Sequence, residues 1–136
     1  MCQTRRITRI KYGGIMELLT PNFTVKEMEC SCGCGFCDFD VEFLDKLQAL
    51  RDVLKRPLVV TSGFRCIPHN TEVGGAKHSK HLAGIAVDIS TWGMTSEFLY
   101  HFMSGAVNGG FTGIGVGKNF VHVDTRKDKS KMWVYK

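Results

Sequence analysis

The chain has 136 residues, of which 43% are hydrophobic and 23% are charged, and its formal net charge is +5. This length and composition indicate one ordinary globular domain and exclude a disordered or low-complexity chain. No apolar run approaches the roughly 18 residues that a membrane span needs, so we expect none. The positive charge favours a polyanionic partner, such as nucleic acid, anionic lipid or a bacterial wall, without choosing among them.

The N-terminal segment, residues 1–15, is basic and shows no helix or strand period. Solvated terminal charge is the simplest interpretation of its arginines and lysine. We therefore predict an arm over residues 1–15 that is dispensable for folding and activity, and a single domain over residues 16–136. The start lacks the apolar segment of a secretory signal, so we expect synthesis in the cytoplasm without export through such a signal.

The first half of the chain carries helix signals. Thr24 and Glu27 have the spacing of a capping box, which predicts a short helix in PNFTVKEME. A longer amphipathic helix is predicted to begin at Asp40, to continue through DVEFLDKLQALRDVLKRP and to end at Pro57. The next segment, LVVT, has the apolar character of a buried strand.

The second half alternates between loop, strand and helix. Residues 62–84 have the composition of a loop, and one of this length in a small domain is usually functional. IAVDIS is predicted to be a strand, and a helix is expected from Thr95 to the pair Gly109–Gly110. FTGIGVG and NFVHVDT follow as strands, with MWVYK as an edge strand. The pattern predicts an α+β fold, a small antiparallel sheet flanked by helices.

Ionisable residues occupy positions inside two of the apolar strands. Asp88 interrupts IAVDIS, and His122 and Asp124 alternate with valines, so these last two share one strand face. His81 stands seven residues before Asp88. Burial of such groups is costly unless they pair or bind a metal. Zinc hydrolases use three nitrogen or oxygen ligands, which suggests His81, Asp88 and His122. The residues alone leave open a buried His–Asp hydrogen-bond network.

One segment carries a specific signature. SKHLAGIAVD, residues 79–88, fills every fixed position of the pattern S-x-H-x-x-G-x-A-x-D. It resembles the family of zinc D-Ala-D-Ala carboxypeptidases, which also includes vancomycin-resistance dipeptidases, phage endolysin peptidases and the hedgehog signalling fold. Thr61–Arg65 is similar to the family's S-G-[FY]-R, and FVHVDT resembles its closing H-x-H or H-x-D strand. The resemblance runs from about Pro21 to Asp124 and implies a hedgehog / DD-peptidase-like zinc peptidase fold.

The resemblance also implies roles for individual residues. His81 and Asp88 would bind zinc, while Ser79 and Gly84 would shape the turn that presents His81, with Ser79 near the substrate. Arg65 would polarise the scissile carbonyl or hold a peptide carboxylate, because a guanidinium matches such groups bidentately. The alternative for Arg65 is a structural pair with an acid.

The third ligand departs from the family pattern. Relatives that end in E-x-x-H place the proton-transferring Glu where this chain has Asn119, and relatives that end in H-x-H have a His where it has Asp124. Either His122 binds zinc and Asp124 is the acid/base, or Asp124 binds zinc and His122 moves the proton. Because two imidazoles and one carboxylate are the more usual zinc ligands, we predict the first assignment.

The resemblance implies zinc-dependent hydrolysis of D-alanine-containing peptide bonds in peptidoglycan, by carboxypeptidase or endopeptidase action. Two settings fit: a monomeric phage endolysin that reaches the cell wall after release, and a bacterial wall-remodelling peptidase. The alternative is a non-catalytic zinc-containing module that binds wall or protein. Nucleic acid is not expected as a partner, because no basic–aromatic stacking pattern is present.

Four cysteines, Cys30, Cys32, Cys34 and Cys37, lie within eight residues. Their spacing is tighter than that of zinc ribbons or fingers. Three interpretations stay open: a structural loop with reduced thiols, a second structural zinc or a pairing that includes Cys66, and a redox function. With a zinc site expected elsewhere, we predict that this loop is scaffold.

Overall fold

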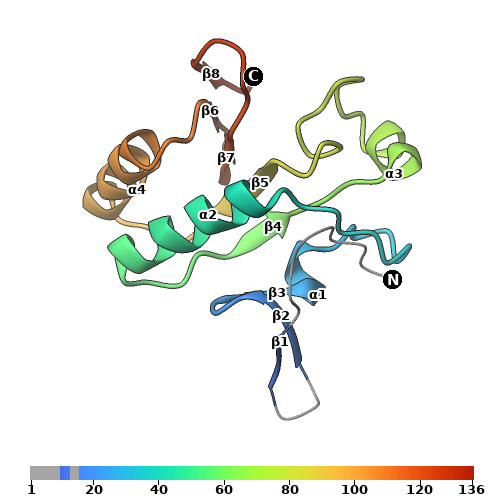
Figure 1. Ribbon diagram of the computed structural model, residues 1–136. Helices are drawn as coiled ribbons and strands as arrows, with labels where there is room; N and C mark the ends of the chain where they lie inside the picture. The colour runs from blue at the N-terminus through green and yellow to red at the C-terminus, as the bar shows by residue number, and fades with distance from the viewer. Residues whose placement is uncertain (1–9, 13–15) are drawn as a thin grey trace.

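The computed structural model describes residues 10–12 and 16–136, and within them the chain forms two sheets and four helices. The small sheet has the order β1-β2-β3, and the large sheet has the order β4-β5-β7-β6-β8 (Figure 1). The strands are β1 (Ile10–Tyr12), β2 (Met16–Thr20), β3 (Phe23–Thr24), β4 (Val60–Ser62), β5 (Ala86–Ser90), β6 (Gly113–Val116), β7 (Phe120–Asp124) and β8 (Lys131–Val134). The helices are α1 (Val25–Met28), α2 (Val41–Leu54), α3 (Ile67–Glu72) and α4 (Ser96–Asn108).

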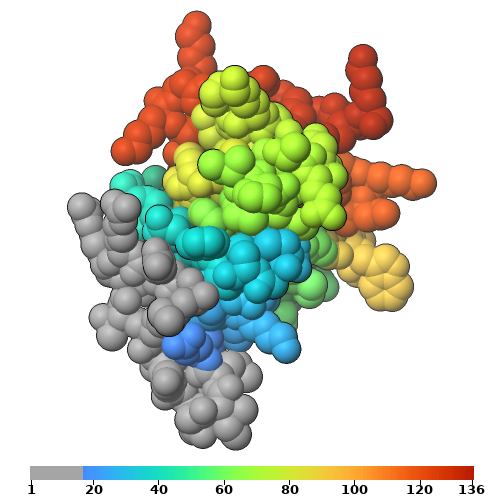
Figure 2. All heavy atoms as spheres, turned by 90° about the vertical axis from the view of Figure 1, so that its right-hand side faces the viewer, coloured from blue at the N-terminus to red at the C-terminus, as the bar shows by residue number. Residues whose placement is uncertain are grey.

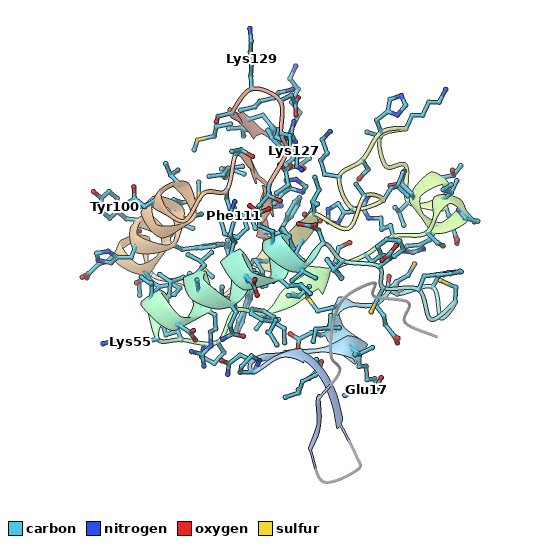
Figure 3. The ribbon with its side chains drawn as sticks, in the orientation of Figure 1. Glu17, Lys55, Tyr100, Phe111, Lys127 and Lys129 are labelled. Carbon is cyan, nitrogen blue, oxygen red and sulfur yellow. The ribbon has the colours of Figure 1, made fainter. Side chains whose placement is uncertain are left out.

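The core lies between one face of the large sheet and the helices α2 and α4. Alternation along β5 and β7 puts Val87, Ile89, Val121 and Val123 on this face, and all four are buried. The aromatic and aliphatic stripes of α2 and α4 complete the core, and Phe111 points into it while Tyr100 and Lys129 project outward (Figure 3). The opposite face of β5 and β7 is therefore left for polar side chains.

The predicted α+β fold is confirmed, and three predicted helices form close to their expected bounds. The Thr24–Glu27 capping box forms the start of α1, with both reciprocal hydrogen bonds present. The Asp40 side chain accepts a hydrogen bond from the Phe43 N–H at the start of α2. Thr95 caps α4 in the same way, which satisfies backbone donors that a helix leaves unpaired.

Four details differ from the sequence prediction. The predicted loop over residues 62–84 contains the short helix α3. The strand expected at LVVT is shifted to Val60–Ser62, and Val59 is 60% exposed, so this edge segment is not a buried strand. The small sheet was missed because its strands are only two to five residues long. The last strand, β8, pairs with β6 in parallel, so the large sheet is mixed rather than antiparallel.

The predicted N-terminal arm lies mostly outside the described residues, since only residues 10–12 of it are placed. These form β1, which pairs antiparallel with β2. The division into an arm and a domain stays a prediction. As to membranes, none of the helices in the described part of the chain has the length and apolar character needed for a span.

Candidate active site

Strand register builds one wall of the candidate site. β5 and β7 pair so that Asp88 lies directly opposite His122, on the sheet face away from the helices. On the other side of β7, Gly113 is the partner of Asp124. A Cβ atom at Gly113 would overlap the Asp124 carboxylate, so glycine leaves the space that this buried side chain fills. The cross-strand pairing thus fixes three polar side chains without any loop.

His81 reaches the same place from the loop that precedes β5. Gly84 makes the tight return to the strand at a φ of +70°, and a Cβ atom there would overlap the Asp38 carbonyl. The Ser79 hydroxyl accepts a hydrogen bond from the His81 N–H at 3.3 Å. The Gly63 carbonyl accepts one from His81 Nδ1 at 2.8 Å, which leaves Nε2 without its hydrogen and free to act as a ligand.

Three ligand atoms converge at the centre of the site. His81 Nε2 lies 3.2 Å from Asp88 Oδ1, His122 Nδ1 lies 3.1 Å from the same oxygen, and the two ring nitrogens are 3.3 Å apart. Ligands held at about 2.0–2.1 Å by a tetrahedral zinc ion are separated from one another by about 3.3 Å. All three side chains are buried, and their spacing fits one tetrahedral metal ion with a position left open.

The second nitrogen of His122 is also engaged. His122 Nε2 lies 2.7 Å from Asp124 Oδ2, on the ring edge opposite to the converging ligand atoms. Arg126 donates to Asp124 three times, from its backbone N–H at 3.0 Å, from Nε at 2.9 Å and from Nη2 at 2.6 Å. The Asp124 side chain is fully buried, and both of its oxygens accept hydrogen bonds.

Both carboxylates are held in the ionised form. Burial alone would raise the pKa of Asp88, but its close contacts with the His122 and His81 rings outweigh burial and lower the pKa below its usual range. Burial also opposes ionisation of Asp124, and its contacts with His122 and Arg126 lower its pKa in the same way. Burial would lower the pKa of His122, whereas its two carboxylate neighbours raise it. The ionised Asp88 carboxylate, which faces both imidazoles, is the part of the cluster that favours a cation.

Arg65 lies at the edge of this cluster and is held on three sides. Its Nη1 donates to Asn70 Oδ1 at 3.0 Å, its Nε donates to Ser62 Oγ at 3.3 Å, and its Nη2 lies 3.6 Å from Asp88 Oδ2. The Asn70 amide is buried and anchored to the Ala76 carbonyl at 2.9 Å. These contacts fix the direction of the guanidinium beside the three convergent ligand atoms.

The cluster opens into a cleft of about 600 Å³. Its walls come from the loop around residues 73–80, from the start of β7 and from the C-terminal segment, and they include Arg65, His78, Ser79, Lys80, Phe120, Arg126, Lys131, Trp133 and Tyr135. Four basic side chains line it, and Asp88 is the only carboxylate among its described lining residues. The electrostatic character of the cleft suits an anionic ligand.

The structure brings together every residue that the sequence singled out for the site, namely Arg65, Ser79, His81, Asp88, His122 and Asp124. Sequence reasoning missed the Gly63 carbonyl, Arg126 and the cleft wall formed by Trp133 and Tyr135. Arg126 could have been found from strand alternation, because it follows Asp124 by two residues. The Gly63 carbonyl is a backbone group, so the residue types in the sequence do not reveal its role.

Comparison with known proteins yields two findings. The model of the peptidase M15 family matches residues 21–124, which is most of the chain and includes the six site residues singled out from the sequence. The chain belongs to the peptidase M15 family. A 70-residue stretch is 40% identical to the zinc D-Ala-D-Ala carboxypeptidase of Streptomyces albus G, and it covers 51% of this chain and 26% of that protein. The chain thus matches about a quarter of the length of this relative.

Proposed function

We propose that this member of the M15 family is a zinc-dependent peptidase that hydrolyses D-alanine-containing peptide bonds of peptidoglycan. The observation that carries the proposal is the convergence of His81 Nε2, Asp88 Oδ1 and His122 Nδ1 at tetrahedral spacing beside an open cleft. The name of the 40% identical relative supports both the metal and the substrate class.

The three convergent residues would hold the zinc ion. When bound, zinc supplies a Lewis acid that activates water and polarises the scissile carbonyl. The chain's own contribution is to fix its ligands before the metal arrives. The Gly63 carbonyl sets the tautomer of His81, and Asp124 does the same for His122 from the far edge of its ring.

Arg65 is proposed to receive the substrate. Its guanidinium points at the edge of the ligand cluster and lines the cleft, while its other two contacts hold it in place. A donor fixed in this way can bind the carbonyl oxygen as negative charge develops on it, or can hold the terminal carboxylate of a peptide. Ser79 also lines the cleft and would contact the substrate beside it.

For Asp124 the contacts favour a positioning role over the predicted acid/base role. Both carboxylate oxygens are occupied by His122 and Arg126, and none of the side chain reaches the cleft surface. Proton transfer needs a group within reach of the substrate. We propose that this group faces the cleft, where His78 and Tyr135 are the ionisable side chains that are neither proposed ligands nor permanently cationic.

The basic cleft agrees with a peptidoglycan stem or cross-link peptide as substrate, since such peptides carry carboxylates. We propose that the protein acts on the cell wall as a monomer. An endolysin of a bacteriophage, synthesised in the cytoplasm and released late in infection, is the setting that we favour over a bacterial wall-remodelling peptidase.

A second candidate function is a zinc-containing module that binds wall peptides without cleaving them. The observation in its favour is that Asp88 is the only carboxylate among the described cleft residues. Asn119, at the position of the family's proton-transferring Glu, is exposed and does not line the cleft.

Digestion of purified peptidoglycan tests the proposal. The untagged protein is incubated with insoluble peptidoglycan, with and without a chelator and then with zinc restored, and the soluble fragments are identified by mass spectrometry. Release of free D-alanine indicates carboxypeptidase action, and loss of cross-linked fragments indicates endopeptidase action. Chelation should abolish either product, and zinc should restore it. Zinc-dependent sedimentation with the wall but no product would favour the binding module.

A further inference from the structure

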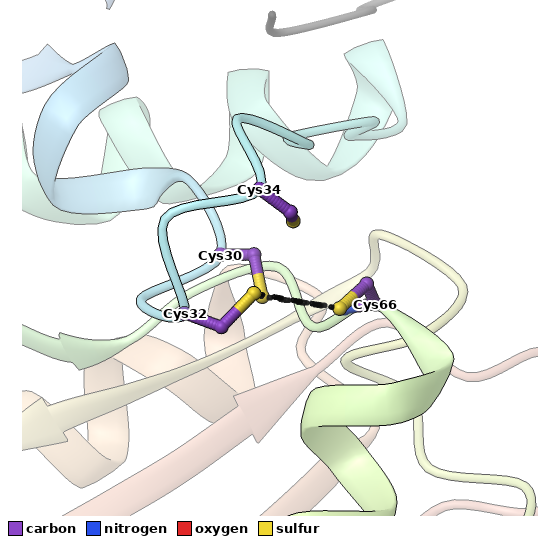
Figure 4. A group of neighbouring side chains, drawn as sticks. All are labelled: Cys30, Cys32, Cys34 and Cys66. Atoms are coloured by element: carbon purple, nitrogen blue, oxygen red, sulfur yellow. Dashed lines mark hydrogen bonds between the residues drawn. The ribbon is translucent and has the colours of Figure 1, made fainter.

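We propose a second zinc site, structural rather than catalytic, formed by Cys30, Cys32, Cys34 and Cys66. The first three lie in the loop between α1 and α2, and Cys66 immediately precedes α3 (Figure 4). The two segments pack side by side, with the loop in cyan below α3 in green in Figure 2. All four sulfur atoms lie within 4.8 Å of one another, and all four thiols are free.

The sulfur positions have the spacing of zinc ligands. Cys30 Sγ lies 3.4 Å from Cys32 Sγ, and Cys66 Sγ lies 3.7 Å from each of them. A tetrahedral zinc ion holds thiolates at about 2.3 Å, so its sulfur atoms are about 3.8 Å apart. A disulfide would need about 2.05 Å. Cys34 is exposed, and its sulfur lies within 4.8 Å of the other three, so it is the proposed fourth ligand.

The backbone around the cluster is shaped to turn the sulfur atoms inward. Gly33 and Gly35 have positive φ values of +88° and +82°, which wind the loop tightly between successive cysteines. The Cys66 N–H points at Cys30 Sγ at 3.4 Å, a contact that stabilises a thiolate. Cys66 occupies the N-cap of α3, yet its side chain makes no capping hydrogen bond, so its sulfur is available to the cluster.

The proposed metal would connect the cysteine loop to the segment that supports the active site. Cys66 directly follows Arg65, and two residues before Arg65 lies Gly63, whose carbonyl holds His81. The Phe64 N–H donates to the Met28 carbonyl at 2.9 Å, which fixes this segment against the residue that ends α1. A zinc ion bound by the cysteines would be a second link between the chain after α1 and the segment that contains Phe64. The site therefore acts as a support for the cleft and takes no part in the reaction.

The closed ligand set determines the chemistry of this second site. Four thiolates fill all positions of a tetrahedral zinc ion and leave none for water, as in structural zinc sites. The His81 cluster, by contrast, offers three ligands and leaves one position open. Soft thiolate ligands also select zinc over magnesium or calcium. The proposal does not depend on the catalytic function, because a site of four thiolates would bind zinc in an inactive protein as well.

X-ray absorption at the zinc edge, together with zinc counting, tests the proposal. The untagged full-length protein is purified with a non-thiol reductant and zinc. We expect two zinc ions per chain and a sulfur shell at about 2.3 Å beside a nitrogen/oxygen shell at about 2.0–2.1 Å. His81→Ala should retain one zinc with sulfur ligands only. The double variant Cys34→Ser/Cys66→Ser should retain one zinc with no sulfur shell.

Ser31→Ala is the matched control, because Ser31 lies between two of the cysteines and contacts His69 Nε2 at 3.0 Å without offering a thiolate. It should keep both zinc ions. If the double variant does not fold, the spectrum of the wild-type protein decides by itself. A single zinc with no sulfur shell, or a disulfide among these four cysteines found by mass spectrometry under the same conditions, overturns the proposal.

Discussion

The His81 cluster and the cysteine cluster place candidate metal ligands in opposite ways. In the first, two of the three ligands come from neighbouring strands whose register sets them face to face, and all three are buried. In the second, the ligands come from a loop and a helix N-cap, and two of the four are exposed. Buried imidazoles with an open position suit chemistry on a substrate, and a closed set of thiolates suits a structural link.

The two clusters differ in the backbone that carries their ligands, which is mainly a sheet in the first and mainly a loop in the second. Sheet register holds the catalytic candidates without the metal, so the strands determine the geometry. In the cysteine loop the Cys30 N–H donates to the Phe36 carbonyl and the Gly33 N–H to the Cys30 carbonyl, contacts within the loop itself. There the metal would determine the geometry, as in small domains whose zinc binding is coupled to folding. The first cluster should therefore lose activity when it loses its metal, and the second should lose stability.

The largest effect is expected from the cysteine cluster. Cys66→Ser removes one proposed thiolate and should lower the free energy of unfolding by about 4 kcal/mol or more, the range typical of lost metal sites. Chemical denaturation in the presence of zinc measures it, with Ser31→Ala as the control that should change little. Equal stability of Cys66→Ser and the wild-type protein would show that the thiols hold no metal.

Arg65→Lys tests whether a change in the cleft lowers hydrolysis without a loss of zinc. Lysine keeps the positive charge but cannot contact Ser62, Asn70 and the substrate at once, so we expect kcat/KM to fall by about 10²–10³-fold with the zinc content unchanged. Steady-state hydrolysis of a stem peptide measures this change. Arg56→Lys is the control, because Arg56 packs on Phe98 away from the cleft and should keep wild-type kinetics.

Asp124→Asn separates the two roles considered for this residue. As a positioning group it should weaken zinc binding by about 10–100-fold, and excess zinc should restore part of the hydrolysis. As an acid/base it would lower hydrolysis by about 10²–10⁴-fold while the zinc affinity stayed the same. Competitive zinc titration and hydrolysis on one preparation distinguish these outcomes. We expect the first.

The smallest effect concerns the N-terminal arm. A chain that begins at Met16 loses the pairing of β1 with β2 on the small sheet, which carries none of the proposed ligands of either cluster. We expect hydrolysis and zinc content to be unchanged and the free energy of unfolding to fall by about 1–2 kcal/mol. Thermal unfolding and a hydrolysis assay measure the two effects. Loss of most of the activity would show that the arm supports the site.

The residues that converge at the His81 cluster could be singled out from the sequence because their signal is local, and their role as zinc ligands stays a prediction. Asp88 and His122 each break an apolar strand, and strand alternation then places His122 and Asp124 on one face. The contact between Asp124 and Arg126 was not predicted, although the two-residue spacing could have suggested it, because alternation alone does not say which neighbour a buried carboxylate contacts. The acid/base role given to Asp124 assumed that it faces the cleft, and its contacts with His122 and Arg126 favour another role.

The cysteine cluster was harder to interpret for a physical reason. Cys30 and Cys66 are 36 residues apart, and their contact depends on how α1 packs against the segment after β4. The spacing in the sequence shows only that the three cysteines of the loop lie close together. It therefore does not distinguish a structural zinc site from a set of reduced thiols. The small sheet was missed because strands of two to five residues are too short to show a clear alternation.

The most direct test of the account measures zinc content and peptidoglycan hydrolysis on the same preparation of His81→Ala. His101→Ala, which removes an exposed imidazole on α4, is the matched control. The account predicts that His81→Ala loses one zinc ion and at least about 10³-fold of its hydrolysis, with a native circular dichroism spectrum. Undiminished zinc content, or near-wild-type hydrolysis after the zinc is lost, would contradict the claim that this cluster is the catalytic centre.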